Sequence, residues 1–171
     1  MSDNTKILVR NAREQDIPAV LEIEAEAASA SQTESTLERF QQRLRVFPNG
    51  FIILVADNEI AGYGHSEKWL DEHEPQPDLS PMATHQPDGR IFFITALAVK
   101  KKFRGRGYRS VLLDKLIETA HLEGCRKVVL ETAHDQDLYQ QRGFKTVQNR
   151  NEHGKSLDRM SLDMAYISRI P

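Results

Sequence analysis

The chain has 171 residues, of which 39% are hydrophobic and 28% are charged, a composition typical of a globular protein with a sizeable core. The 23 basic and 25 acidic residues leave a formal net charge of −2, which disfavours binding to nucleic acids or anionic membranes through bulk charge. The lone cysteine, Cys125, excludes an intrachain disulfide and is typical of a reducing compartment. We therefore expect a single domain over residues 1–171.

No apolar run approaches the roughly 20 residues that a membrane helix needs. Residues 1–6 lack the apolar core of a signal peptide. We therefore expect a cytoplasmic protein that makes no membrane contact.

The first half of the chain predicts three strands and two helices. Residues 7–10 and 51–56 are apolar runs that predict strands, and residues 60–69 predict the returning strand after a tight turn. Residues 16–24 and 37–47 place apolar side chains at intervals of three and four positions, which predicts two helices.

A segment without periodicity separates the two halves. Residues 70–89 contain four prolines and several acidic residues, and we expect a long loop there, a feature that is often functional in a compact domain. After it we expect strands at residues 90–99, 126–131, 144–149 and 157–165, a helix at residues 108–123 and a short helix at residues 137–142. A glycine-bearing turn at residues 100–107 joins the first of these strands to the first of these helices. The order β-α-α-β-β-β-α-β-α-β-β predicts an α/β (α+β) fold in which helices flank a mixed sheet.

The turn before the central helix has the features of an anion site. An apolar strand ends at Val99, and the sequence Arg104-Gly105-Arg106-Gly107 leads into a helix. Backbone N–H groups in the first turn of a helix have no intrahelical partner, and the helix dipole adds partial positive charge there. Together with the arginine side chains, this arrangement predicts a site for a phosphate-bearing cofactor.

Two motifs make the chain resemble the GNAT superfamily of acyl-CoA-dependent N-acyltransferases. The family pattern Arg/Gln-x-x-Gly-x-Gly/Ala falls on Arg104, Gly107 and Arg109, and Arg109 departs from it because the last position is normally glycine or alanine. Residues 138–144, with the sequence Leu-Tyr-Gln-Gln-Arg-Gly-Phe, are similar to a second family motif. Upstream of it, Thr132 and Asp135 stand where many relatives carry asparagine and alanine.

The resemblance implies the GNAT fold, with a mostly antiparallel sheet, and acetyl-CoA as co-substrate. It also implies that the backbone of one strand pairs with the pantetheine arm, as an added strand would, and that amides of the following turn hold the pyrophosphate. The cofactor-binding residues implied in this way are Leu97, Ala98, Val99, Arg104, Gly105, Arg106, Gly107, Tyr108, Arg109 and Ser110.

A narrower resemblance points to the arylalkylamine (serotonin-type) N-acetyltransferase branch. In that branch two histidines on the central strand relay a proton from the amine, and the matching positions here are Phe93 and Thr95, which cannot act as bases. The likeness therefore describes the scaffold and the cofactor site, while the substrate and the proton path differ. The segments that carry it are residues 47–51, 85–90, 96–99 and 139–144.

Acetyl transfer to an amine needs a proton donor for the leaving thiolate and an acceptor for the amine proton. Tyr139 is the candidate general acid, because its hydroxyl can donate a proton; the alternative is a tyrosine packed at the sheet edge with its hydroxyl in water. Glu67 and His65 are candidates for the base, and the two-residue period places them on one face of a strand. A structural or solvated role is the alternative for both. Further candidates for the base are His73, His85 and Glu131.

The sequence leaves two other functions open. The chain can be a non-catalytic acyl-CoA-binding module, since the branch histidines are missing. It can also bind nucleic acid through the basic block Lys100–Arg109, with Phe103 and Tyr108 stacking on bases, although the net charge argues against this.

As an enzyme, the chain is expected to act on a small-molecule or peptide amine by direct attack in a ternary complex, as a monomer or a homodimer. No nucleic-acid partner is expected. No metal site is expected either, because no set of side chains has the spacing of metal ligands.

Overall fold

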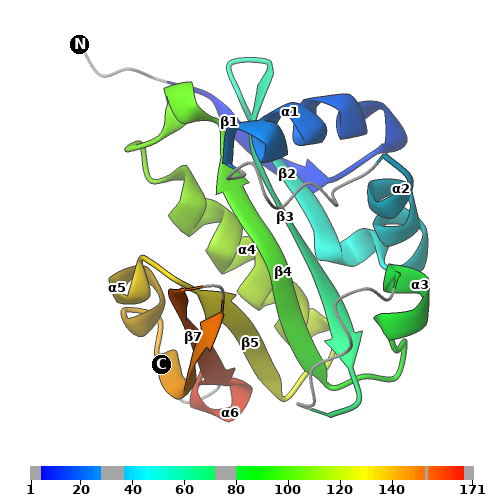
Figure 1. Cartoon of the computed structure of the whole chain (residues 1–171). Helices are drawn as coiled ribbons and strands as arrows, with labels where there is room; N and C mark the ends of the chain where they lie inside the picture. Colours follow the sequence, from blue (N-terminus) through cyan, green and yellow to red (C-terminus); the bar gives the residue numbers. More distant parts are fainter. Residues whose placement is uncertain (1–4, 28–36, 72–79, 153, 168–171) are drawn as a thin grey trace.

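The computed structural model describes residues 5–27, 37–71, 80–152 and 154–167. These residues form one sheet of seven strands with helices on both faces (Figure 1). The strands are β1 (Ile7–Asn11), β2 (Phe51–Ala56), β3 (Glu59–Trp69), β4 (Ile91–Val99), β5 (Lys127–Thr132), β6 (Lys145–Glu152) and β7 (Lys155–Asp163). The helices are α1 (Ile17–Ala27), α2 (Leu37–Val46), α3 (Pro81–Thr84), α4 (Tyr108–Leu122), α5 (Gln136–Gln140) and α6 (Met164–Ile167).

The sheet has the strand order β1-β2-β3-β4-β5-β7-β6. Neighbouring strands run antiparallel except β4 and β5, which run parallel because α4 connects them as a crossover. The order and the pairing confirm the predicted mixed, mostly antiparallel sheet.

The strands β4 and β5 pair only over their first residues. Their register ends with Ile94 opposite Leu130. Beyond this point β4 continues to Val99 along β3, while β5 continues to Thr132 along β7. The two strands therefore separate in the middle of the sheet, and one edge of each is left without a strand partner (Figure 1).

A bulge in β4 accompanies this separation. His65 of β3 lies opposite Ala96, whereas the next residue, Ser66, lies opposite Ile94, so Thr95 is an extra residue in β4. A bulge bends the strand that contains it. It also exchanges the two faces, since side chains alternate with a period of two. Even-numbered residues of β4 contribute to the core under α4 before the bulge, and odd-numbered residues do so after it.

The sheet is covered by α4 on one face and by α1 and α2 on the other (Figure 1). The side chains of Leu112, Leu113 and Leu116 of α4 are completely buried against the strands. Burial of each such side chain contributes about 1.5–3 kcal/mol. The core on the opposite face is formed by Ala12, Ile17, Val20, Ile23, Phe40, Phe51, Ile53 and Tyr63. Packing on both faces thus fixes the position of β4.

The structure differs from the sequence prediction in two segments. The prediction of a loop throughout residues 70–89 is wrong, because the single turn α3 begins at Pro81, a residue whose fixed φ suits the start of a helix. Residues 72–79 of that segment lie outside the described part of the chain. The last strand was predicted at residues 157–165, but it ends at Asp163, and the short helix α6 follows it. The side chain of Asp163 accepts the N–H of Ala165 (2.9 Å) and caps α6.

We expect Gly62→Ala to destabilise the fold more than Gly64→Ala. A methyl group at residue 62 would lie 2.8 Å from the carbonyl oxygen of Ala98, whereas one at residue 64 would first meet the flexible end of Leu116, at 2.9 Å. Overpacking of this kind costs about 1–3 kcal/mol, and the backbone of a paired strand yields less than a side chain. Urea unfolding of both variants tests this, and equal midpoints would contradict the close approach of β3 to β4.

Candidate active site

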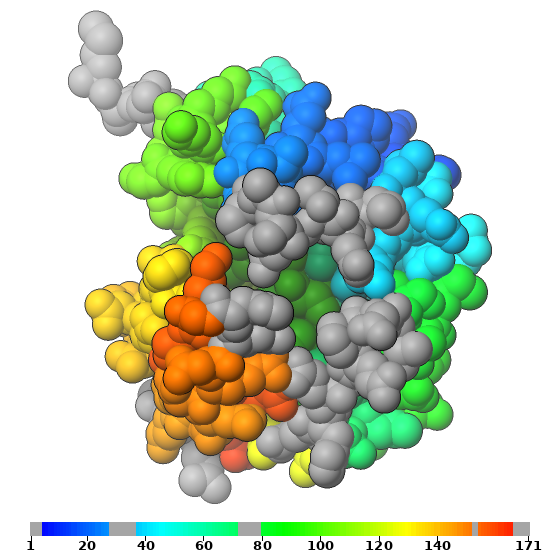
Figure 2. Space-filling view, viewed as in Figure 1, coloured from blue at the N-terminus to red at the C-terminus, as the bar shows by residue number. Residues whose placement is uncertain are grey.

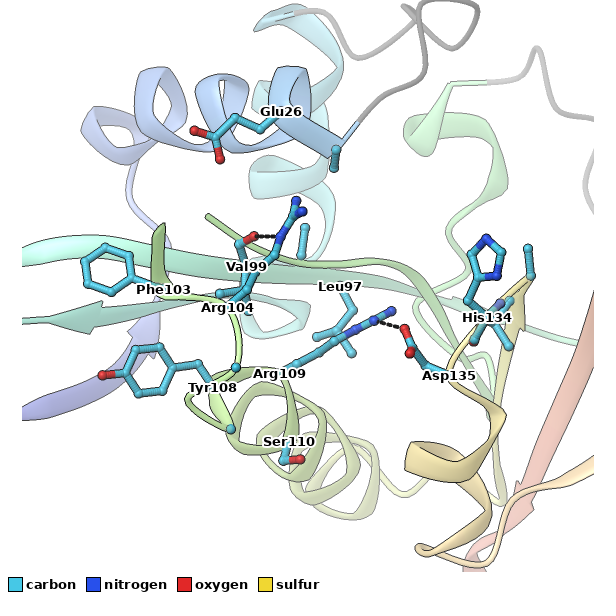
Figure 3. Close-up of a pocket in the computed structure, with 16 residues that line it drawn as sticks. Glu26, Leu97, Val99, Phe103, Arg104, Tyr108, Arg109, Ser110, His134 and Asp135 are labelled. Carbon is cyan, nitrogen blue, oxygen red and sulfur yellow. Dashed lines mark hydrogen bonds and ion pairs between the residues drawn. The ribbon is translucent and has the colours of Figure 1, made fainter. Parts of the chain in front are cut away.

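A cleft of about 590 Å³ opens where β4 and β5 separate (Figure 3). The space-filling view shows the molecule hollowed between its blue upper part and its yellow and orange lower part, with green residues at the base (Figure 2). The cleft is lined by the end of α1, the last residues of β4, the turn into α4 and the residues after β5. All the predicted cofactor-binding residues except Arg106 line it.

The turn into α4 presents free backbone amides to the cleft. Gly107 has a φ of +79°, a left-handed conformation that suits glycine, and it caps the N-terminus of α4. The helical ladder starts with the N–H of Val111, which bonds to the carbonyl of Gly107 (3.3 Å). The amides of Tyr108, Arg109 and Ser110 precede this ladder, so they are available to an anion.

The last residues of β4 present a strand edge to the same cleft. Leu97, Ala98 and Val99 pair with β3 on one side, and the pairing with β5 has ended on the other. Their backbone groups on that side can therefore pair with an extended ligand that bears amides. This is the geometry that the predicted pantetheine contact requires.

The two arginines of the glycine turn differ in position. Arg104 lines the cleft, and its Nε donates to the carbonyl of Val99 (3.2 Å), so its guanidinium is held at the end of β4 (Figure 3). Arg106 instead lies over the ring of Phe103, at 5.4 Å from the ring centroid. Arg104 is thus the better placed of the two to meet a phosphate in this cleft.

Arg109 reaches from α4 across the cleft to the residues after β5 (Figure 3). Its Nη1 forms an ion pair with Asp135, and its Nη2 donates a hydrogen bond of 3.3 Å to the hydroxyl of Tyr139. Tyr139 is 3% exposed, so its side chain is packed inside the protein. Burial raises the pKa of Tyr139 above its usual value, and the charge of Arg109 opposes this rise. Tyr139 itself does not line the cleft, whereas Arg109 does.

Sequence reasoning assigned no role to the lining residues outside β4 and the glycine turn. Thr132 ends β5 and its hydroxyl accepts the N–H of His134 (3.1 Å), while Asp135 adopts a φ of +64°. The sequence indicated Thr132 and Asp135 only by their departure from the family motif. Glu26 had no sequence signal, because only the fold brings the end of α1 to the turn, where Glu26 accepts the N–H of Lys101 (2.8 Å).

Glu67 lies outside the cleft and is fully engaged by other side chains. Its Oε1 pairs with Arg43 of α2 (2.8 Å), and its Oε2 accepts hydrogen bonds from Trp69 Nε1 (3.0 Å) and Thr84 Oγ1 (2.7 Å). Its residue is 5% exposed. Removing one partner of a buried ion pair typically costs about 3–5 kcal/mol, so Glu67 anchors α2 and α3 to the sheet.

His65 also lies outside the cleft, on the face that α2 covers. Its ring packs against Phe40 and Phe51, and its Nδ1 contacts the hydroxyl of Thr95. That hydroxyl donates to the carbonyl of His65 (2.9 Å). Burial lowers the pKa of His65 well below its usual value, and Arg43 lowers it further. The predicted common face of His65 and Glu67 is confirmed, since both contact α2.

The further base candidates are held in other parts of the structure. Glu131, on β5, is paired with Arg150 (2.7 Å) and Arg159 (3.1 Å). His85 stacks on the ring of Phe47, and its Nδ1 accepts the backbone N–H of Lys68 (3.1 Å). His73 lies outside the described residues.

The basic block before α4 is poorly suited to nucleic acid. The ammonium groups of Lys100 and Lys102 both pair with Glu59. Phe103 and Tyr108 are only 7% exposed, so their rings cannot stack on bases. Within the described ranges, no group of three histidine, cysteine or acidic side chains can hold a metal ion, and no helix is long and apolar enough to cross a membrane.

Residues 17–144 match the Acetyltransferase (GNAT) family, from the start of α1 to the end of the second motif. The chain belongs to this family. The match confirms the prediction of a GNAT-type acyltransferase that was drawn from the two motifs. No curated protein matches the sequence of this GNAT protein.

Three solved structures illustrate the fold. The loading GNATL domain of CurA from Lyngbya majuscula has a TM-score of 0.79 at 15% identity and covers 94% of this chain and 99% of its own. A ribosomal-protein-alanine N-acetyltransferase from Brucella melitensis has a TM-score of 0.68 at 24% identity, covering 91% and 99%. The protein yncA from Salmonella typhimurium, solved with its cofactor acetyl-CoA, has a TM-score of 0.66 at 18% identity, covering 92% and 94%.

We expect the free energy of unfolding to fall as the pH is lowered from 7 to 5, and His65→Gln to reduce this fall. The native protein keeps buried His65 neutral, whereas the unfolded chain binds a proton there below a pH of about 6.5. The contribution of His65 is therefore lost as the pH falls from that value toward the lower native pKa, by at most about 1.4 kcal/mol per pH unit.

Urea unfolding of wild type and variant across this range measures the effect. His121→Gln, on the exposed side of α4, is the matched control and should leave the slope unchanged. The pKa of His85 is also lowered by burial, so part of the slope should persist in both variants. A wild-type stability that is constant between pH 5 and 7 would contradict the buried neutral state of both histidines.

Proposed function

We propose that this GNAT protein transfers an acetyl group from acetyl-CoA to a primary amine by direct attack in a ternary complex. The observation that carries the proposal is a single cleft that combines the free edge of residues 97–99 with the first-turn amides of α4. A strand edge suits an extended chain that bears amides, and a helix N-terminus suits a diphosphate. Acetyl-CoA carries both groups in one molecule.

The cofactor fits this chain at the glycine turn. Among the described residues, no heavy atom lies within 4 Å of the position that a Cβ would take at Gly105 or Gly107, so a pyrophosphate can approach the backbone closely. Arg104 would add a positive charge at the end of β4. Acetyl-CoA is the cofactor of the S. typhimurium protein, which supports acetyl as the group transferred.

In the proposed reaction the amine nitrogen attacks the thioester carbonyl carbon. A carbon–nitrogen bond forms, and the carbon–sulfur bond breaks with its electron pair going to sulfur. Because Tyr139 does not line the cleft either, its hydroxyl proton reaches that sulfur through an intermediary, and the amine loses a proton to a base. General acids of this kind contribute about 10²–10⁴-fold to the rate.

Glu67 and His65 are retained as proposed bases, and each would act through an intermediary because neither lines the cleft. His65 contacts Thr95, which lies two residues before Leu97 on the strand that lines the cleft. This contact makes His65 the better connected of the two. The Thr95 hydroxyl gives its hydrogen to the carbonyl of His65, so Nδ1 donates in this contact and Nε2 is the ring nitrogen that can accept a proton. The low pKa keeps His65 neutral at pH 7 and makes it a weak base.

We propose a small-molecule or peptide amine as the acceptor. The B. melitensis protein is a ribosomal-protein-alanine N-acetyltransferase, which supports peptide amines. Small-molecule amines form the other acceptor class, because the motif likeness to the arylalkylamine branch at residues 47–51 and 139–144 describes the scaffold and not the substrate. Phenethylamine and a peptide with an N-terminal alanine therefore represent the two acceptor classes in an activity screen.

We expect Gly107→Glu to abolish saturable 1:1 binding of acetyl-CoA. The carboxylate would lie at the amides proposed to hold the pyrophosphate, where it blocks and repels the phosphates. Isothermal titration calorimetry with acetyl-CoA measures the binding. If a folded wild-type protein showed no binding, the cofactor assignment would be wrong.

The matched control is Gly154→Glu. Gly154 has a φ of +77° and open space around it, so the substitution brings the same backbone strain and the same charge to the β6–β7 turn. We expect acetyl-CoA binding to survive in this variant. Loss of binding in both variants would assign the effect to strain and not to the pyrophosphate site.

We expect Tyr139→Phe to lower kcat by about 10²-fold or more while leaving the Kd for acetyl-CoA nearly unchanged. The substitution removes the proposed proton donor and keeps the packing against Phe144. Thiol release with the most active amine of the screen measures kcat. An unchanged kcat would contradict the assignment of Tyr139, and wild-type binding without turnover on any amine would favour the non-catalytic acyl-CoA-binding module.

A further inference from the structure

The residue that departs from the family motif makes an unusual set of contacts. Arg109 stands at the position where the family normally has glycine or alanine. Its side chain joins α4 to the segment after β5, by an ion pair with Asp135 and a hydrogen bond to Tyr139. Arg109 and Asp135 also line a second pocket next to the cleft, so this ion pair separates the two cavities.

We propose that Arg109, held in place by Asp135, is a positioning residue that orients the Tyr139 hydroxyl for proton transfer to the leaving thiolate. The inference rests on the proposed function, because it assumes that Tyr139 is the proton donor. Arg109 acts through Tyr139 and is not itself the acid.

The direction of the hydrogen bond supports this role. A guanidinium can only donate, so the oxygen of Tyr139 must accept the bond from Nη2 of Arg109. The phenolic proton is then not used in this contact and is free to be given to another acceptor. A tyrosine whose hydroxyl donated to a carboxylate or a carbonyl would not be available in this way.

The charge of Arg109 opposes the effect of burial on Tyr139. Burial raises the pKa of Tyr139 and would make it a weaker acid, whereas the positive charge and hydrogen bond of Arg109 lower that pKa. Asp135 acts in the opposite direction on the hydroxyl but fixes the guanidinium from its far end. Arg109 comes from α4 and Asp135 immediately precedes α5, so the pair connects these two helices.

The arrangement also carries costs that packing alone does not explain. The Nε of Arg109 is buried and finds no hydrogen-bond partner among the described residues, and an unsatisfied buried donor costs about 1–3 kcal/mol. Asp135 takes a positive φ, which aspartate tolerates better than most residues but which is still strained. Such costs at two paired residues beside a cleft favour a functional role.

A direct test is the titration of Tyr139 by NMR in protein labelled with 13C at tyrosine Cζ, with Tyr139→Phe used to assign the signal. We expect Arg109→Gln to shift the pKa of Tyr139 upward and Arg109→Lys to restore part of the shift. The matched control is Arg142→Gln, which removes a positive charge that pairs with Asp114 of α4. An unmoved Tyr139 titration in Arg109→Gln would overturn the proposal.

Kinetics separate positioning from phosphate binding. With acetyl-CoA and the active amine, Arg109→Gln should lower kcat to a value between wild type and Tyr139→Phe, with the KM for acetyl-CoA nearly unchanged and a partial rescue by Arg109→Lys. A raised KM with an unchanged kcat would overturn the proposal, because it would make Arg109 a ligand of the cofactor phosphates.

The titration needs no acceptor amine, so the two proposals fail separately. If the wild type transfers no acetyl group, the proposed function is wrong. The role of Arg109 in that reaction is then wrong too, even if the titration shows that Arg109 is coupled to Tyr139. An active wild type with an unmoved titration overturns only the role of Arg109.

Discussion

The cleft exists because β4 and β5 stop pairing after Ile94 and Leu130. If the two strands paired to their ends, the backbone groups of residues 97–99 would be used within the sheet and no extended ligand could bind there. The extra residue Thr95 accompanies this change, since a bulge bends the strand and alters which side chains face each core. The strand edge, the amides of α4 and the segment after β5 meet only because of this separation.

The helix α4 connects stability and function in this protein. Its buried leucines pack on a sheet in which Gly62 and Gly64 allow close approach, so the helix is held rigidly. The N-terminus of the same helix supplies the free amides of the cleft. A site built on a packed helix is more precise than one built on a loop, which matters when a thioester must be aligned to within a fraction of an ångström.

Several candidates named from the sequence turn out to hold the structure together. The two-residue period correctly placed His65 and Glu67 on one face of β3, but the period does not say that α2 covers this face. Arg43 of that helix neutralises Glu67, and Phe40 encloses His65. Conversely, the end of α1 lines the cleft although nothing in its residues indicated this, because contacts between distant segments leave no local pattern.

The sequence by itself determined the order of the seven strands and of the helices α1, α2, α4 and α5, the glycine turn that begins α4 and the membership of the GNAT family, because these depend on periodicity and on motifs of adjacent residues. It missed the short helices α3 and α6. It also marked Arg109 as a departure, but not where that side chain points. Only the tertiary structure decided that Arg109 reaches Asp135 and Tyr139, which lie 26 and 30 residues away in the chain. Such contacts depend on how α4 and β5 are packed, and packing is a property of the whole fold.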